Sequence, residues 1–154
     1  MIDDYNDAAS PESFPLRIDL IPEMDLGEPN NSPKDAMEVK PGQTVNPAIF
    51  PTGDQDWFVI SVEKRGYLQV TARDVPRDIK PQVRFITWDE WEGEKVVRNW
   101  RYLPDGCAVE PGKYYICLID DYNDAFSPQT FPLRIEFLEE MDPDEAADVL
   151  ADLP

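Results

Sequence analysis

The sequence predicts an all-β protein of about eight to nine antiparallel strands, arranged as a sandwich or a barrel. Short runs of β-forming residues alternate with turn residues about every 8 to 12 positions. Sixteen prolines suit short strands and sheet edges, and no internal segment keeps the 3.6-residue apolar period of a helix. With 154 residues, 42% of them apolar, the chain can build one packed domain of ordinary size.

The expected strands are bounded by turn signals such as Pro111-Gly112. In the third strand the alternate residues Phe58, Ile60 and Val62 are predicted to face the core, because successive side chains of a strand point to opposite faces. The nine predicted strands lie near residues 35–40, 44–50, 56–63, 66–73, 81–88, 95–102, 106–110, 113–120 and 131–138.

Residues 2–25 repeat residues 119–142 at a fixed offset of 117, with 17 of 24 positions identical. This spacing is too long for a solenoid and about right for a whole domain, so we expect a tandem array whose neighbouring domains are each other's partners. The predicted organisation is a closing strand and tail of a preceding repeat (1–25), a complete sandwich (26–141) and a linker or short helical tail (142–154).

The repeated strand carries an apolar face that needs a partner. Phe14-Pro15-Leu16-Arg17-Ile18 has the same sequence as residues 131–135. We therefore expect either a strand-exchanged dimer through residues 13–21 or a disordered N-terminus.

The net charge and the composition of the chain exclude several classes of partner and of catalytic mechanism. With 32 acidic and 14 basic residues the formal net charge is −18, which repels nucleic acid and anionic membranes and attracts cations or basic partners. No apolar run approaches the roughly 20 residues that span a bilayer. The sequence has no histidine, which excludes Ser-His-Asp and Cys-His catalysis, and no carboxylate pair lies in a recognisable acid/base context. We expect no enzymatic activity, no nucleic-acid partner and no membrane partner.

The two cysteines, Cys107 and Cys117, flank the Pro111-Gly112 turn. A hairpin disulfide requires a register that places them opposite each other, whereas a two-residue loop would put them on opposite faces. The alternative is a pair of buried free thiols.

Three motifs occur in a fixed order: Glu28-Pro29-Asn30-Asn31-Ser32-Pro33, then Gly53-Asp54-Gln55-Asp56-Trp57-Phe58, then Val109-Glu110-Pro111-Gly112-Lys113-Tyr114-Tyr115-Ile116. Together they resemble the bacterial pre-peptidase C-terminal (PPC) domain family over about residues 26–138. The resemblance implies a jelly-roll-like sandwich of secreted or cell-surface bacterial proteins, often C-terminal to peptidases and sometimes cleaved off.

The PPC family is similar to the collagen-binding domains of clostridial collagenases, in which linker and loop acids bind calcium. Carried over to this sequence, the resemblance implies a Ca²⁺ site formed by Glu28, Asn30, Asn31, Asp54 and Asp56. Ca²⁺ prefers six to eight hard oxygen ligands, which two distant segments can supply together. In the alternative interpretation the asparagines form turns, Asp54 caps its own turn, and Asp56 is a solvated residue at a strand start.

A second acidic segment, Asp120-Asp121-Tyr122-Asn123-Asp124, lacks the glycine and the distal glutamate of an EF-hand loop. We interpret it as a solvated acidic loop rather than a metal site.

Four aromatic residues lie on the predicted 81–102 hairpin: Trp88, Trp91, Trp100 and Tyr102. Exposed rings there could bind polysaccharide or an extracellular protein, and Trp91, flanked by acids, is the best candidate for an exposed ring. The alternative is that Trp88 and Trp100 cover one end of the core.

These features together predict a non-catalytic accessory module from a tandem array in a secreted bacterial protein. Its expected role is structural, as a spacer stabilised by calcium. The alternative is a ligand-binding module that uses the aromatics of the hairpin.

Overall fold

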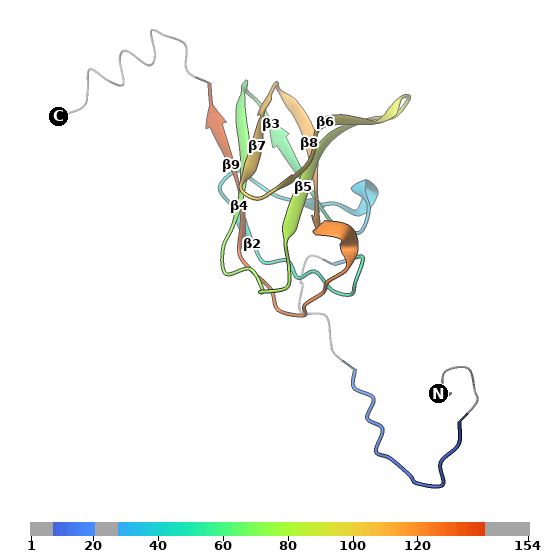
Figure 1. Ribbon diagram of the computed structural model, residues 1–154. Coiled ribbons are helices and arrows are strands. Elements are labelled where there is room, and N and C mark those ends of the chain that lie inside the picture. Colours follow the sequence, from blue (N-terminus) through green and yellow to red (C-terminus); the bar gives the residue numbers. More distant parts are fainter. Residues whose placement is uncertain (1–7, 21–27, 141–154) are drawn as a thin grey trace, which may run out of the picture.

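The computed structural model describes residues 8–20 and 28–140 (Figure 1). Within this part of the chain, nine strands form two sheets, and two 3-10 helices are the other regular elements. The elements in chain order are η2 (Pro33–Asp35), β1 (Met37–Glu38), β2 (Thr44–Val45), β3 (Asp56–Val62), β4 (Gly66–Ala72), β5 (Pro81–Asp89), β6 (Gly93–Tyr102), β7 (Asp105–Val109), β8 (Gly112–Asp120), η3 (Asp121–Asn123) and β9 (Leu133–Glu139).

The predicted β-sandwich is confirmed. One sheet has five strands in the order β1-β3-β8-β5-β6, and the other has four in the order β2-β9-β4-β7. Each of the nine expected strands exists, although β1 and β2 are only two residues long. One pairing differs from the antiparallel expectation, because β1 runs parallel to β3. A two-residue strand has no sequence pattern that would reveal its direction.

The core lies between the two sheets and contains the side chains predicted from β3. Phe58, Ile60 and Val62 are buried there, so the alternation of β3 was interpreted correctly. They meet residues of the four-stranded sheet such as Leu68 and Leu133, neither of which is exposed. Apolar burial on the inner faces of two sheets is the main source of stability in such a sandwich.

The outer face of the five-stranded sheet carries a second apolar cluster. Trp57, Ile86, Cys117 and Ile119 are buried in it, and the partly buried residues packed against it include Trp100. Alternate residues of β3 and β8 therefore serve two different clusters, one on each face of the sheet. This explains why Trp57 is apolar although it lies on the face of β3 opposite to Phe58 and Ile60.

The two cysteines do not form a disulfide. β7, with Cys107, pairs with β4, whereas β8, with Cys117, pairs with β3 and β5 in the other sheet. The Pro111-Gly112 turn thus connects the two sheets rather than the arms of a hairpin. Cys107 lies in the main core and Cys117 in the outer cluster, and both are buried free thiols.

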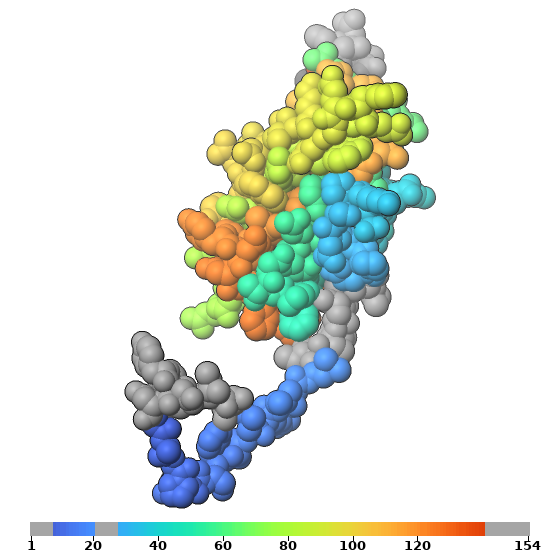
Figure 2. Space-filling view, turned by 90° about the vertical axis from the view of Figure 1, so that its right-hand side faces the viewer, coloured from blue at the N-terminus to red at the C-terminus, as the bar shows by residue number. Residues whose placement is uncertain are grey.

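Residues 8–20 contain no strand and lie apart from the body of the sandwich (Figure 2). The predicted tail over 142–154 and the ends of the predicted domains fall outside the described residues. In the described part of the chain, no helix is long and apolar enough to cross a membrane.

Candidate functional site

The segment that leads into the sandwich lies against the start of β3. The backbone N–H of Trp57 donates to the carbonyl oxygen of Asn30 at 2.8 Å, which fixes residues 28–31 beside the Gly53-to-Asp56 loop. That loop is held by Asp54, whose N–H donates to Pro51 O at 3.1 Å and whose Oδ2 accepts the N–H of Phe50 at 3.1 Å. Two distant segments of sequence therefore meet at one end of β3.

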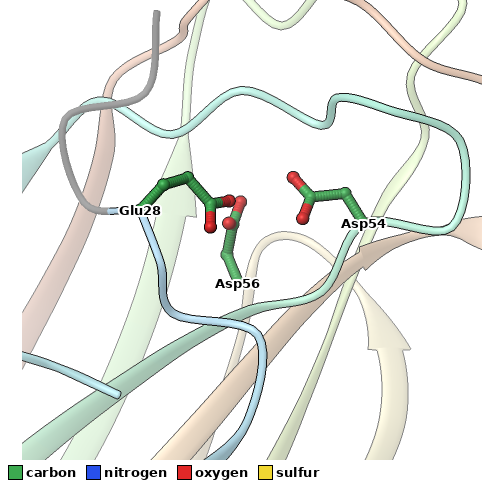
Figure 3. Close-up of side chains that lie close together, drawn as sticks. All are labelled: Glu28, Asp54 and Asp56. Atoms are coloured by element: carbon green, nitrogen blue, oxygen red, sulfur yellow. The ribbon is translucent and has the colours of Figure 1, made fainter. Parts of the chain in front are cut away.

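Three carboxylates converge at this meeting point (Figure 3). Glu28, Asp54 and Asp56 each offer one oxygen, and these oxygens all lie within 4.8 Å of one another. Asp56 is completely buried, Asp54 is buried, and Glu28 is half-buried. Ionised carboxylates this close together repel one another, and a bound cation relieves that repulsion, so the cluster could hold a metal ion.

The side-chain amides of Asn30 and Asn31 face the same carboxylates. With its nitrogen toward the acids, Asn30 donates to Asp56 Oδ1 at 2.9 Å and to both oxygens of Glu28 at 3.2 Å. In the same orientation Asn31 donates to Asp54 Oδ1 at 2.9 Å and to the carbonyl oxygen of Gln55 at 3.0 Å. Rotating either amide by half a turn presents its oxygen instead, so both side chains can serve the cluster with or without a cation.

The donors fit the chemistry of calcium. Ca²⁺ binds oxygens at about 2.3–2.6 Å, so two ligands of one ion can be at most about 5 Å apart. The 4.8 Å limit on the three carboxylates meets this condition. Carboxylates, amide oxygens and the nearby Gln55 carbonyl are all hard oxygen donors, and the set includes no nitrogen or sulfur ligand that would favour zinc or copper. The five residues that the resemblance implied as ligands thus lie together in space.

The alternative interpretation of these residues is correct only in part. Asp54 does cap its own turn through the N–H of Phe50, and the N–H of Asn30 donates to Glu28 Oε2 at 3.2 Å. Asp56, however, is not a solvated residue, because its side chain is fully buried. Sequence alone could not show this, since a strand-start aspartate usually faces water.

The second acidic segment is a structured loop rather than a solvated one. Asp120 accepts the N–H of Lys80 at 2.9 Å through Oδ1 and that of Ala125 at 3.1 Å through Oδ2. Asp121 Oδ2 accepts the hydroxyl hydrogen of Tyr102 at 2.7 Å. Asp120 and Asp121 are buried, and with the exposed Asp124 they bring three carboxylates within 4.8 Å. The hydrogen bonds of Asp120 and Asp121 explain why these acids are there, namely to fix the loop after β8.

The four aromatics of the β5–β6 hairpin do not form one surface. Trp88 is 52% exposed and the tip residue Trp91 is 93% exposed. Trp100 packs on the outer apolar cluster, where the guanidinium carbon of Arg84 lies 5.9 Å from its ring centroid. Tyr102 lies at the far end of the hairpin, bonded to Asp121. The covering role considered for Trp88 and Trp100 therefore holds for Trp100 alone.

Trp88 borders a hollow of about 460 Å³ on the outer side of the five-stranded sheet. The other residues that line it are Ser32, Pro33, Lys34 and Tyr115. Sequence reasoning missed Tyr115 as a surface residue, although the alternation along β8 gives the signal. Tyr114 is buried in the core, so its neighbour must point the other way. The place of Lys34 beside the hollow could not be predicted from the sequence, because it depends on how the segment before β1 folds back.

The described residues form a small β-sandwich with a cluster of oxygen donors, able to hold a metal ion, at the point where the chain enters it. Among solved structures, the pre-peptidase C-terminal domain of a collagenase from Bacillus anthracis matches this chain with a TM-score of 0.50 and 16% sequence identity. The match covers 70% of this chain and 100% of that domain. It confirms, at the level of the fold, the resemblance to PPC domains that the three motifs indicated. No protein-family model and no curated protein matches the sequence.

Proposed function

We propose that the chain is a non-catalytic accessory module of a secreted or cell-surface bacterial protein, and that it acts as a structural spacer stabilised by calcium. The observation that carries the proposal is the convergence of Glu28, Asn30, Asn31, Asp54 and Asp56 from two distant segments. The likeness in fold to a collagenase PPC domain supports the accessory role. The duplicated segment supports a tandem array in which neighbouring domains of one chain are joined through such sites.

The mechanism is one of cross-linking by charge. A divalent cation bound there would offset two of the three carboxylate charges and would let both amides turn their oxygens inward. Glu28 and the asparagines belong to the leading segment, whereas Asp54 and Asp56 belong to the body of the sandwich. A cation held by both groups would fix the angle at which the chain enters the domain. Without the cation, hydrogen bonds such as Trp57 N–H to Asn30 O would still hold this joint.

Thermal unfolding in EDTA and in excess Ca²⁺ tests the proposal. A ligand that binds only the native state adds about 2.7 kcal/mol at 100 times its dissociation constant. For a domain of this size that corresponds to a rise of roughly 10 °C in the melting temperature. Asp56→Asn should remove the rise, and Asp124→Asn in the second acidic loop should keep it. A melting temperature that is the same in EDTA and Ca²⁺ would overturn the calcium part of the proposal.

A second candidate function, ligand binding, is favoured by the hollow beside Trp88. Its aromatic walls, Trp88 and Tyr115, and the ammonium of Lys34 offer stacking surface and a hydrogen-bond donor. Such a wall suits sugar rings of a polysaccharide or a side chain of an extracellular protein. Trp91 at the hairpin tip is exposed enough to extend the contact.

Retention on a panel of immobilised polysaccharides and matrix proteins tests this second function. Trp88→Ala is expected to reduce retention without lowering the melting temperature, because the ring is half exposed. Trp91→Ala tests the contribution of the tip, and Tyr122→Ala, an exposed aromatic on another loop, is the matched control. If wild type is not retained, or if Tyr122→Ala has the same effect as Trp88→Ala, this function is rejected.

A further inference from the structure

The slot that β9 fills is complementary to a segment that the chain carries twice. β9 lies between β2 and β4 and pairs with β4 over all seven of its residues. The residues before it bond to the opposite side of the slot, with Ser127 N–H donating to Ile49 O at 2.7 Å and Phe131 N–H to Pro47 O at 3.0 Å. Because β9 is the last strand of the described chain, it can leave the slot and return without threading through a loop.

The inner side of β9 is among the most buried parts of the protein. Phe131, Leu133 and Ile135 are at most 1% exposed. Their copies at the offset of 117 have the same identities but no contact with this core. These copies, Phe14, Leu16 and Ile18, are 64%, 64% and 88% exposed. The chain thus carries a second apolar strand whose sequence already fits the core of this sandwich.

The copy also has the local geometry of the original. Glu12 N–H donates to Ser10 Oγ at 3.1 Å, and at the matching place Gln129 N–H donates to Ser127 Oγ at 3.1 Å. Further on, Arg17 pairs with Asp19 at 2.8 Å, and the corresponding Arg134 pairs with Glu136. In an extended backbone the side chains of residues i and i+2 lie on one face, which allows such a pair to form. The copy therefore shares two local side-chain contacts with the strand that it repeats.

One substitution makes the copy the weaker occupant. Leu20 stands in the place of Phe137, whose ring packs so closely over Gly66 that an added Cβ there would lie 2.5 Å from it. Intramolecular β9 is therefore favoured in the monomer, and the copy competes only when β9 is released at high protein concentration.

We propose that residues 13–20 of one chain enter the β9 slot of a second copy of this chain and form a strand-exchanged dimer. Each chain fills the slot of the other, which gives a closed two-fold arrangement rather than an open fibre. Exchange requires release of β9, so it is slow in the native state and fast during refolding. The displaced β9 then takes the exposed position that residues 13–20 have in the monomer.

The test refolds the full chain at high concentration and measures mass by size-exclusion chromatography with light scattering. Wild type is expected to give a species of twice 17.7 kDa beside the monomer. Leu16→Asp should remain monomeric with an unchanged melting temperature, since Leu16 is exposed in the monomer. Arg17→Ser, on the outward face of the same segment, is the matched control and should still dimerise.

Disabling β9 itself separates exchange from other kinds of association. Leu133→Asp puts a charge into the core and should leave the chain folded only as a dimer, rescued by residues 13–20 of the partner. Adding Leu16→Asp to Leu133→Asp should abolish folding. The proposal is overturned if refolded wild type is monomeric and Leu133→Asp unfolds alone, or if dimers persist in Leu16→Asp, which would indicate a different interface.

Discussion

Arg98 and Asp105 form a two-pronged ion pair that joins the two sheets at one side of the sandwich. Arg98 Nε lies 2.9 Å from Asp105 Oδ2, and Nη2 lies 2.9 Å from Oδ1. Arg98 belongs to β6, the last strand of the five-stranded sheet, and Asp105 to β7, the last strand of the other. The hydrogen bond to Asp105, followed by its charge, raises the pKa of Arg98 above its usual value. Planar guanidinium and carboxylate groups match in this geometry, which a lysine cannot reproduce.

The first prediction concerns this ion pair. Arg98→Lys is expected to lower the melting temperature by a few degrees, because a single ammonium replaces two parallel hydrogen bonds and Asp105 is only 10% exposed. Urea unfolding and differential scanning calorimetry measure the loss. Arg17→Lys is the control, since Arg17 and Asp19 are both largely exposed and their pair contributes little. Equal effects of the two substitutions would show that the Arg98 pair does not brace the sheets.

The second prediction concerns Gly106, where β7 passes beneath Tyr67 of β4. A Cβ at this position would lie 2.6 Å from Cε1 of Tyr67 and still closer to the carbonyl oxygen of Leu68. Backbone in a paired strand cannot move aside cheaply, so Gly106→Ala should destabilise the domain by about 1–3 kcal/mol. Chemical denaturation provides the measurement. Gly93→Asn at the hairpin tip is the control, because no atom lies within 4 Å and Asn tolerates the φ of +76° there.

β3 shows which part of the fold can be predicted from the sequence. Its alternation predicted that Phe58, Ile60 and Val62 face the core, and the strand occupies residues 56–62 as expected. Period-2 patterns specify strands because each residue's face is decided by its own position in the chain. The resemblance carried by the order of the motifs also implied that the five oxygen donors belong to one site. The structure places them within reach of one another.

The features that the sequence did not show depend on which strands become neighbours. The turn at Pro111-Gly112 has ordinary hairpin residues, yet it crosses between sheets, so Cys107 and Cys117 are in different clusters. The burial of Asp56 depends likewise on residues 28–31 folding over the start of β3. Partner choice between strands is set by packing of the whole core, and no local pattern encodes it.

The third prediction is an alkaline loss of stability caused by Cys107. Burial raises the pKa of this thiol from 9.0 to about 11. Between these two pH values the folded protein keeps a proton that the unfolded chain releases, so the free energy of unfolding falls as pH rises through this window. The stabilising contribution is present in full below pH 9. Urea unfolding at several pH values between 8 and 11 should show a steeper decline for wild type than for Cys107→Ala.

Burial of the two cysteines also predicts how fast they react with an alkylating reagent, which can be measured on the wild-type protein. Cys117 is also buried, and its burial, followed by the charge of Asp56, raises the pKa of its thiol. Thiolate is the reactive form, so neither cysteine should react quickly with an alkylating reagent at pH 8 in the native protein. In denaturant both should react at the rate of a model thiol. Rapid modification of the native protein would contradict the buried, protonated state of the two thiols.

The last prediction adds a charge to the oxygen cluster. Asn30→Asp replaces a fully buried amide that lies beside Glu28 and Asp56 with a fourth carboxylate. Without a cation the extra repulsion should destabilise the domain by about 1–3 kcal/mol, because the substitution also removes the hydrogen bonds that the amide donates to Glu28 and Asp56. With excess Ca²⁺ much of this loss should be recovered, since carboxylates are the stronger calcium ligands. The difference between the melting temperatures in Ca²⁺ and in EDTA should therefore be larger for the variant than for wild type. Asn123→Asp, on the exposed loop after β8, adds the same charge elsewhere and should leave that difference unchanged. If the cluster is instead a network of hydrogen bonds only, Asn30→Asp will be destabilised equally in EDTA and in Ca²⁺.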